Sequence, residues 1–179
     1  MLRRVYDEKY LKVRPTYLKC SVADEWLWFS KFSRDVRNMK CFDKILDGSG
    51  WCLDKDIIGD GTLYSKDTCC IVPQEVNNFL LDNRSSMGKY PTGVKFNKSK
   101  GKFEANVNRW GKRKYLGTFT DVSVALLTYQ KAKREYAIEL SRKWENILDE
   151  RVLNFLINFD PAYKVNAVEV DDENIIFKI

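Results

Sequence analysis

The chain of 179 residues is predicted to be an α+β protein in which small antiparallel sheets are each covered by a helix. Apolar and polar side chains alternate in short runs between residues 94 and 119, and the residues that follow have helical spacing. Two more short apolar runs between residues 51 and 72 precede a proline that is typical of a helix start. Charge is also unevenly distributed. Residues 89–114 hold nine Lys or Arg and one acid, a net charge of +8, whereas the whole chain carries +6.

The first predicted module covers residues 1–82 and is nearly balanced in charge. Up to residue 88 the chain contains 14 basic and 13 acidic side chains. Residues 23–36, ADEWLWFSKFSRDV, are predicted to form one short helix. Its aromatic side chains, Trp26, Trp28, Phe29 and Phe32 among them, are interpreted mostly as core residues.

Residues 51–81 predict the order strand, strand, helix. The first strand ends in Leu53-Asp54-Lys55-Asp56, a turn follows at Gly59-Asp60-Gly61, and a second strand covers residues 68–72. Pro73 begins a helix, with Asn77 one turn into it. Asp54, Asp56 and Asn77 offer hard oxygen ligands of the kind that Mg²⁺ accepts. The alternative is that the two Asp residues form a charged strand end that caps a turn.

Residues 90–140 are predicted to form a three-stranded antiparallel meander that packs on a helix. Val94 and Phe96 alternate with Lys95 and Asn97, and the pattern resumes at 103–108 and 115–119 after two turns. The helix is expected to begin with Thr120 as its N-cap and to cover the apolar face of the sheet. The opposite face is expected to be free and to carry Lys95, Asn106, Asn108, Arg109 and Arg113.

The positive charge on this small sheet predicts a polyanionic partner, with double-stranded DNA as the leading one. Asn and Arg are residue types that read base edges, and they lie here among aromatic residues. The alternative is a solvated Lys-rich hairpin that discourages aggregation. The candidate nucleic-acid-binding residues are Lys95, Lys98, Lys100, Lys102, Asn106, Asn108, Arg109, Trp110, Lys112, Arg113 and Lys114.

The same segment resembles the ethylene-response-factor (Apetala-type) DNA-binding domain. The resemblance rests, in order, on Gly93-Val94, Phe103-Glu104-Ala105, Leu116-Gly117-Thr118-Phe119 and the helix from Asp121. It implies a sheet that lies in the major groove, with Arg and Trp side chains of the strands reaching bases and phosphates. The first strand here has fewer Arg residues than the family pattern. The positions that match the family's contacts are Lys95, Asn106, Asn108, Arg109, Trp110, Arg113 and Lys114.

The N-terminal module is similar to relatives of phage-encoded HNH-type homing endonucleases, many of which join such a module to an ethylene-response-factor-like domain. This resemblance implies a ββα finger in which a His base activates water and one divalent metal is bound. The chain contains no histidine, and Lys55 stands where the base is expected, so ordinary HNH chemistry is not expected. The segments that carry the resemblance are Tyr17 to Cys20, Glu25-Trp26, Leu53 to Ile57, Tyr64-Ser65, Cys69, Val72-Pro73 and Asn77.

The last segment, residues 145–179, is acidic, with eight acids and three bases. The helix that covers the sheet is expected to run on through Trp144 as far as Phe159, where Asp160-Pro161 stops it. Two strands, at 164–170 and 175–179, are predicted on either side of an acidic turn. This segment should be repelled by a phosphate backbone.

The five cysteines contain no C-x-x-C pair, and without His partners they do not predict a zinc site. We interpret them as reduced residues that fill the core. No apolar run approaches the ~20 residues of a membrane span, and Met1 leads directly into charged residues. These features predict a cytoplasmic protein, in the host cytosol if the chain is phage-encoded, with no membrane partner.

The predicted organisation is an HNH-like module at 1–82, a linker at 83–88, a DNA-binding domain at 89–144 and an acidic helix and hairpin at 145–179. The leading function is a duplex-DNA-binding protein on an HNH endonuclease scaffold without hydrolytic activity. One alternative is a divalent-metal-dependent nicking or homing endonuclease that uses Lys55 with Asp54, Asp56 and Asn77, with Mg²⁺ as the candidate metal. Another is a phage inhibitor that contacts a host defence or transcription complex. The sequence leaves open the DNA target, the oligomeric state and the contacts of the acidic segment.

Overall fold

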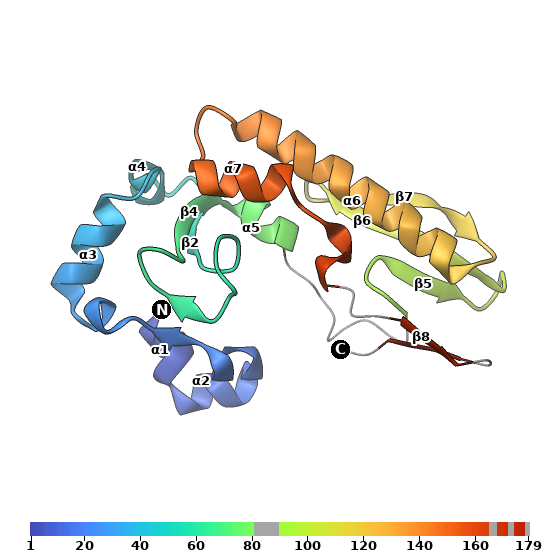
Figure 1. Ribbon diagram of the computed structural model, residues 1–179, viewed down its shortest axis with the longest axis horizontal. Coiled ribbons are helices and arrows are strands. Elements are labelled where there is room, and N and C mark those ends of the chain that lie inside the picture. The colour runs from blue at the N-terminus through green and yellow to red at the C-terminus, as the bar shows by residue number, and fades with distance from the viewer. Residues whose placement is uncertain (81–89, 165–167, 172–173, 178–179) are drawn as a thin grey trace. The chain divides into compact units, whose positions relative to one another are not determined.

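The computed structural model describes residues 1–80, 90–164, 168–171 and 174–177. It divides the chain into two compact units, each described by itself below. Unit 1 consists of Met1–Leu80 together with Trp144–Phe155, and unit 2 of Leu81–Lys143 together with Leu156–Ile179. The α+β class is confirmed (Figure 1). The predicted linker at 83–88 lies outside the described residues, and the predicted acidic segment at 145–179 is divided between the two units.

Unit 1 combines short helices with two small sheets. Strand β2 (Trp51–Asp54) pairs antiparallel with β4 (Cys70–Pro73), and helix α5 (Gln74–Leu80) follows directly, so the strand, strand, helix order is the one predicted. The prediction missed a second, parallel pair between β1 (Ser21–Val22) and β3 (Leu63–Tyr64). The other helical elements are α1 (Leu2–Tyr6), α2 (Glu8–Val13), η1 (Pro15–Lys19), η2 (Asp24–Leu27), α3 (Phe29–Arg37) and α4 (Phe42–Leu46).

The aromatic segment at 23–36 does not form one helix. It is divided into η2 and α3 by Trp28, which is extended at φ −95° and ψ 115°. The division turns the second half of the segment, so the helical faces expected from a single period do not exist. Trp26 is buried, and its indole N–H donates to Asp35 Oδ2 at 3.0 Å. Trp28 and Phe29 are 66% and 80% exposed, so the prediction that they belong to the core is wrong.

The cysteine thiols fill space in unit 1 as predicted. All five are free, and Cys41, Cys69 and Cys70 are buried in the core. Burial raises the pKa of Cys69 to about 11 and raises that of Cys70 further, so both thiols stay protonated at neutral pH.

Unit 2 is built on a three-stranded antiparallel sheet. Its order is β5 (Val94–Asn97), β6 (Lys102–Arg109) and β7 (Lys112–Phe119), and helix α6 (Val122–Trp144) runs along it (Figure 1). Val94 and Ala105 of the sheet form a buried cluster with Val122 and Ala125 of the helix, as the apolar alternation predicts. The helix cap is Asp121 rather than Thr120, because Asp121 Oδ1 accepts the Ser123 N–H at 2.6 Å.

The long helix does not run on to Phe159. It ends at Trp144, and α7 (Glu150–Ile157) begins after a turn. The new start is stabilised by Asp149, whose Oδ1 accepts the Arg151 N–H at 2.9 Å. A short helical turn, η4 (Pro161–Lys164), precedes the strands β8 (Val168–Asp171) and β9 (Asn174–Phe177), which pair antiparallel as predicted. The predicted turn residues 172–173 and strand residues 165–167 and 178–179 lie outside the described residues. Within the described part of the chain, no helix is long and apolar enough to cross a membrane.

Candidate functional site

The face of the β5–β7 sheet turned away from α6, here called the open face, is the candidate interface. Register and burial define it, because residues paired across strands share a face and alternate residues change face. Ala105 and Val107 are buried on the helix side, so Asn106 and Asn108 lie on the open face, opposite Tyr115 and Arg113 of β7. A bulge between Ala105 and Asn106 shifts the register by one residue, because Ala105 pairs with Gly117 and Asn106 with Tyr115. The open face is lined by Lys95, Asn97, Lys102, Glu104, Asn106, Asn108, Arg113, Tyr115 and Thr118.

Arg109 does not belong to the open face, and this part of the prediction is wrong. It follows Asn108 in the same strand and therefore points to the other side, where its guanidinium pairs with Glu139 of α6. Trp110 is likewise held against the helix. Its backbone N–H donates to the Tyr136 hydroxyl at 3.1 Å and its ring meets the Tyr136 ring with centroids 5.1 Å apart. The Lys143 ammonium group lies 4.8 Å from the Trp110 ring centroid.

These contacts fasten the tip of the β6–β7 hairpin to the helix. The tip itself is a two-residue loop in which Trp110 and Gly111 both have positive φ, at 54° and 71°. This is the backbone of a type I′ turn, which suits the twist of antiparallel strands. We call these contacts of Arg109 and Trp110 with Tyr136, Glu139 and Lys143 the clamp. Sequence reasoning missed it, because the three helix residues are separated from the hairpin by most of α6.

The one acid of the basic segment lies in the middle of the open face. Glu104 Oε1 accepts from Asn97 Nδ2 at 2.7 Å and from Lys100 Nζ at 3.2 Å, and Lys95 Nζ lies 3.2 Å from Oε2. The hydrogen bond from Asn97 and those from the two lysines lower the pKa of Glu104 to about 2. Two of the predicted phosphate-binding cations are therefore already paired.

Five predicted cations remain exposed. In the part of the chain that the structure describes, no ion pair is formed by Lys98, Lys102, Lys112, Arg113 or Lys114. Three of them are consecutive at the start of β7. Asn106 adds an unusual feature, because its Nδ2 is buried and lacks a hydrogen-bond partner among the described residues.

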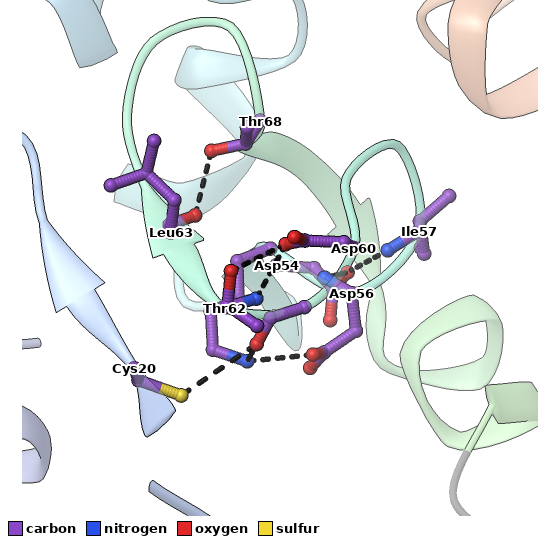
Figure 2. Close-up of polar contacts among 10 residues, drawn as sticks. Cys20, Asp54, Asp56, Ile57, Asp60, Thr62, Leu63 and Thr68 are labelled. Carbon is purple, nitrogen blue, oxygen red and sulfur yellow. Dashed lines mark hydrogen bonds and ion pairs between the residues drawn. The ribbon is translucent and has the colours of Figure 1, made fainter. Parts of the chain in front are cut away.

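The second predicted site is the acidic strand end of β2, and Figure 2 shows how its side chains lie. Asp54 is buried, and its Oδ1 accepts the backbone N–H groups of Asp56 and Ile57 at 2.8 and 3.0 Å. Beyond it, Asp60 Oδ1 accepts from both the N–H and the hydroxyl of Thr62 at 2.9 and 2.6 Å. Both carboxylates therefore cap turns in the loop between β2 and β3. The same loop also contacts Cys20, whose thiol donates a hydrogen bond to the Gly61 carbonyl at 3.6 Å.

Lys55 is enclosed by this loop. Only 6% of the residue is exposed, and Nζ donates to Asp56 Oδ1 and to the Gly61 carbonyl, each at 2.6 Å. The same ammonium lies 5.7 and 5.5 Å from the ring centroids of Tyr17 and Tyr64. Burial lowers the pKa of Lys55, but the hydrogen bond and charge of Asp56 outweigh it and leave the pKa above its ordinary value. A general base must be free of its proton near neutral pH, so this environment favours a structural role.

Each of the predicted metal ligands has another partner in the structure. Asn77 hydrogen-bonds the Cys52 thiol, whereas Asp56 is paired with Lys55 and Asp54 with backbone amides. Burial raises the pKa of Asp54. Among the described residues there is no group of three His, Cys, Asp or Glu side chains that could hold a metal ion.

Comparison with known proteins adds no further assignment: no family model, curated protein or solved structure matches the chain.

Proposed function

We propose that the chain binds duplex DNA through the open face of the β5–β7 sheet. The observation that carries the proposal is the composition of this face and of the hairpin beside it. Asn108 and Arg113 face each other across β6 and β7, both exposed, and the exposed cation Lys102 lies on the same face opposite Asn97, with Lys98 in the adjoining turn. Asn and Arg side chains recognise base edges in the major groove, while Lys contacts phosphate oxygens.

The clamp on α6 supports the same proposal. A two-stranded hairpin is marginally stable by itself, and long-range contacts at its tip keep it in one orientation. Arg109 and Trp110 would act here by positioning Asn108 and Arg113, rather than by touching the DNA themselves. A rigid interface loses less conformational entropy when it binds.

In this proposal unit 1 is an HNH-like finger without hydrolytic activity. The order of β2, β4 and α5 supports a ββα finger, and the paired, buried Lys55 argues against base catalysis. The endonuclease alternative would require Asp54, Asp56 and Asn77 to leave their present partners. Plasmid incubated with the protein and Mg²⁺ is therefore expected to stay supercoiled. Nicking that disappears in Asp54→Ala and Asn77→Ala variants would favour the endonuclease.

The proposal is tested by measuring duplex affinity as a function of salt. We expect log K to fall with log salt, and the double variant Lys98→Gln/Lys102→Gln to reduce the slope by about 1.8 if each lysine neutralises one phosphate. Lys131→Gln is the matched control, because Lys131 is exposed on α6. Absence of binding to any duplex at low salt, or an equal effect of the control, would contradict the proposal.

A further inference from the structure

Glu104 is the negative centre of an otherwise cationic face. Its side chain is 10% exposed, whereas those of Lys95 and Lys100 are 56% and 57% exposed. The carboxylate is thus covered by the lysines that it pairs with. Lys100 comes from the turn between β5 and β6, and Lys95 lies opposite Glu104 in the register. One acid therefore holds two cations that belong to different parts of the sheet.

The three donors use most of the capacity of this carboxylate. A carboxylate has about four lone-pair directions, and Asn97, Lys100 and Lys95 take three of them. Among the described residues, the one lone-pair direction without a donor is on Oε2, the oxygen that Lys95 contacts. With a pKa of about 2, Glu104 keeps its charge throughout the physiological pH range.

Its place along β6 puts this charge in a line of base-reading residues. Glu104, Asn106 and Asn108 are two residues apart and lie on the same face. A phosphate that approached Lys95 or Lys100 would also approach Glu104, and the two negative charges would repel each other. A carboxylate is, in contrast, a good acceptor for the amino group of cytosine in the major groove.

We propose that Glu104 makes recognition selective by restraining Lys95 and Lys100, so that duplexes of unrelated sequence bind weakly, and by accepting a base amino group from the correct one. This inference rests on the proposed function and names how the same face discriminates between sequences. It combines an attractive contact to the right partner with a repulsive one to the wrong partner.

The decisive variant is Glu104→Gln, compared with Glu135→Gln. Both remove one negative charge, but Glu135 is exposed on α6. Affinities are measured over a range of salt for a duplex recovered by selection from a random pool and for an unrelated duplex. We expect Glu104→Gln to bind the unrelated duplex more tightly, with a salt slope steeper by up to about 1.8 as two lysines become free. The ratio of the two affinities should fall by about 5- to 150-fold, the range of one good contact to a base edge.

A second pair of variants keeps the test independent of the folding of Glu104→Gln. Lys95→Gln/Lys100→Gln in the native background should lower the slope for unrelated duplex by less than in the Glu104→Gln background, because Glu104 restrains both lysines although its single charge offsets only one of them. Combined with Glu104→Gln, the same two substitutions should abolish the gain in affinity for the unrelated duplex that Glu104→Gln alone produces. An equal loss of slope in the two backgrounds, or a gain in Glu135→Gln equal to that in Glu104→Gln, would overturn the inference. Failure of the native protein to bind any duplex would instead refute the proposed function.

Discussion

Single residues decide which charges on this protein are available to a partner. Lys55 carries a charge but is enclosed, and its two hydrogen bonds hold together the loop after β2. Glu104 pairs with Lys95 and Lys100, two lysines that the sequence alone would suggest are free. Buried or paired charges shape the structure locally, whereas the exposed Lys112 and Lys114 contribute to an external field.

Gly61 is the residue on which the Lys55 environment depends. Its φ is +80°, and a Cβ atom there would lie 2.7 Å from Asp56 Oδ1, the oxygen that Lys55 contacts. Gly61→Ala is expected to lower the free energy of unfolding by about 2 kcal/mol, from left-handed strain and from displacement of the half-exposed Asp56 carboxylate from Lys55. Urea unfolding measures the loss.

Gly48→Ala is the matched control for this prediction. Gly48 has a similar φ of +71°, but a Cβ atom there would meet no other atom within 4 Å. Gly48→Ala should lower the free energy of unfolding only by the left-handed backbone strain, about 1 kcal/mol. Equal losses in the two variants would show that contact with the Asp56 carboxylate contributes nothing.

At the scale of elements, the β6–β7 hairpin and α6 behave as one structural piece. The strands supply the open face, and the helix supplies Val122 and Ala125 for the core. The same helix supplies Tyr136, Glu139 and Lys143 to the hairpin tip. Gly93 permits a further close approach, since a Cβ atom there would lie 2.1 Å from the ring of Tyr129 in α6.

The hydroxyl of Tyr136 is expected to stabilise the hairpin tip measurably. Tyr136→Phe keeps the buried ring but removes the acceptor of the Trp110 N–H, so unfolding free energy should fall by about 1 kcal/mol. Amide exchange of Trp110 should also become faster. Tyr115→Phe is the control, because its ring is 55% exposed and its hydroxyl bonds Thr118 on the surface. A Trp110 amide that exchanges at the same rate in both variants would contradict the role of this bond.

At the scale of the whole molecule, the two units are not two continuous stretches of sequence. Residues Trp144–Phe155 return to unit 1, where Lys40 Nζ donates to the Leu148 carbonyl at 2.8 Å and the Cys41 thiol to the Ile147 carbonyl at 3.2 Å. The Trp144 ring packs edge-on against Trp51 with centroids 5.3 Å apart, and its N–H donates to Glu75 at 2.5 Å. Unit 1 therefore depends on residues that follow the β5–β7 sheet and α6 in the chain.

Trp144→Ala is accordingly expected to destabilise unit 1 by about 2 kcal/mol, through lost burial and the lost hydrogen bond to Glu75. Trp28→Ala is the control in the same unit, and because Trp28 is 66% exposed it should stay within about 0.5 kcal/mol of the native protein. Chemical unfolding followed by circular dichroism compares the two. Similar stabilities would mean that the return of the chain at Trp144 does not support unit 1.

The sequence predicted the segments of β2, β4 to β9, α5 and α6, because strand alternation, turn residues and helix spacing are local signals. It did not predict α1, α2, α4 or the pairing of β1 with β3. The strands of the meander, the order of β2, β4 and α5 and the final pair of strands follow from these local signals. The face of Arg109 was also contained in the local pattern, since it adjoins Asn108 in a strand. The prediction of one helix at 23–36 was wrong for a local reason as well, because the extended backbone at Trp28 interrupts the helical spacing and divides the segment in two.

The sequence by itself determined the α+β class, the basic meander with its covering helix, and the lack of a histidine for HNH chemistry. Those conclusions depend only on residue types and on spacing along the chain. Only the tertiary structure decided that Glu104 restrains two lysines, that Arg109 and Trp110 fasten the hairpin to α6, and that Lys55 is enclosed by aromatic rings. Such contacts join residues distant in sequence, and the energies of charges depend on distance and burial, which spacing along the chain does not specify.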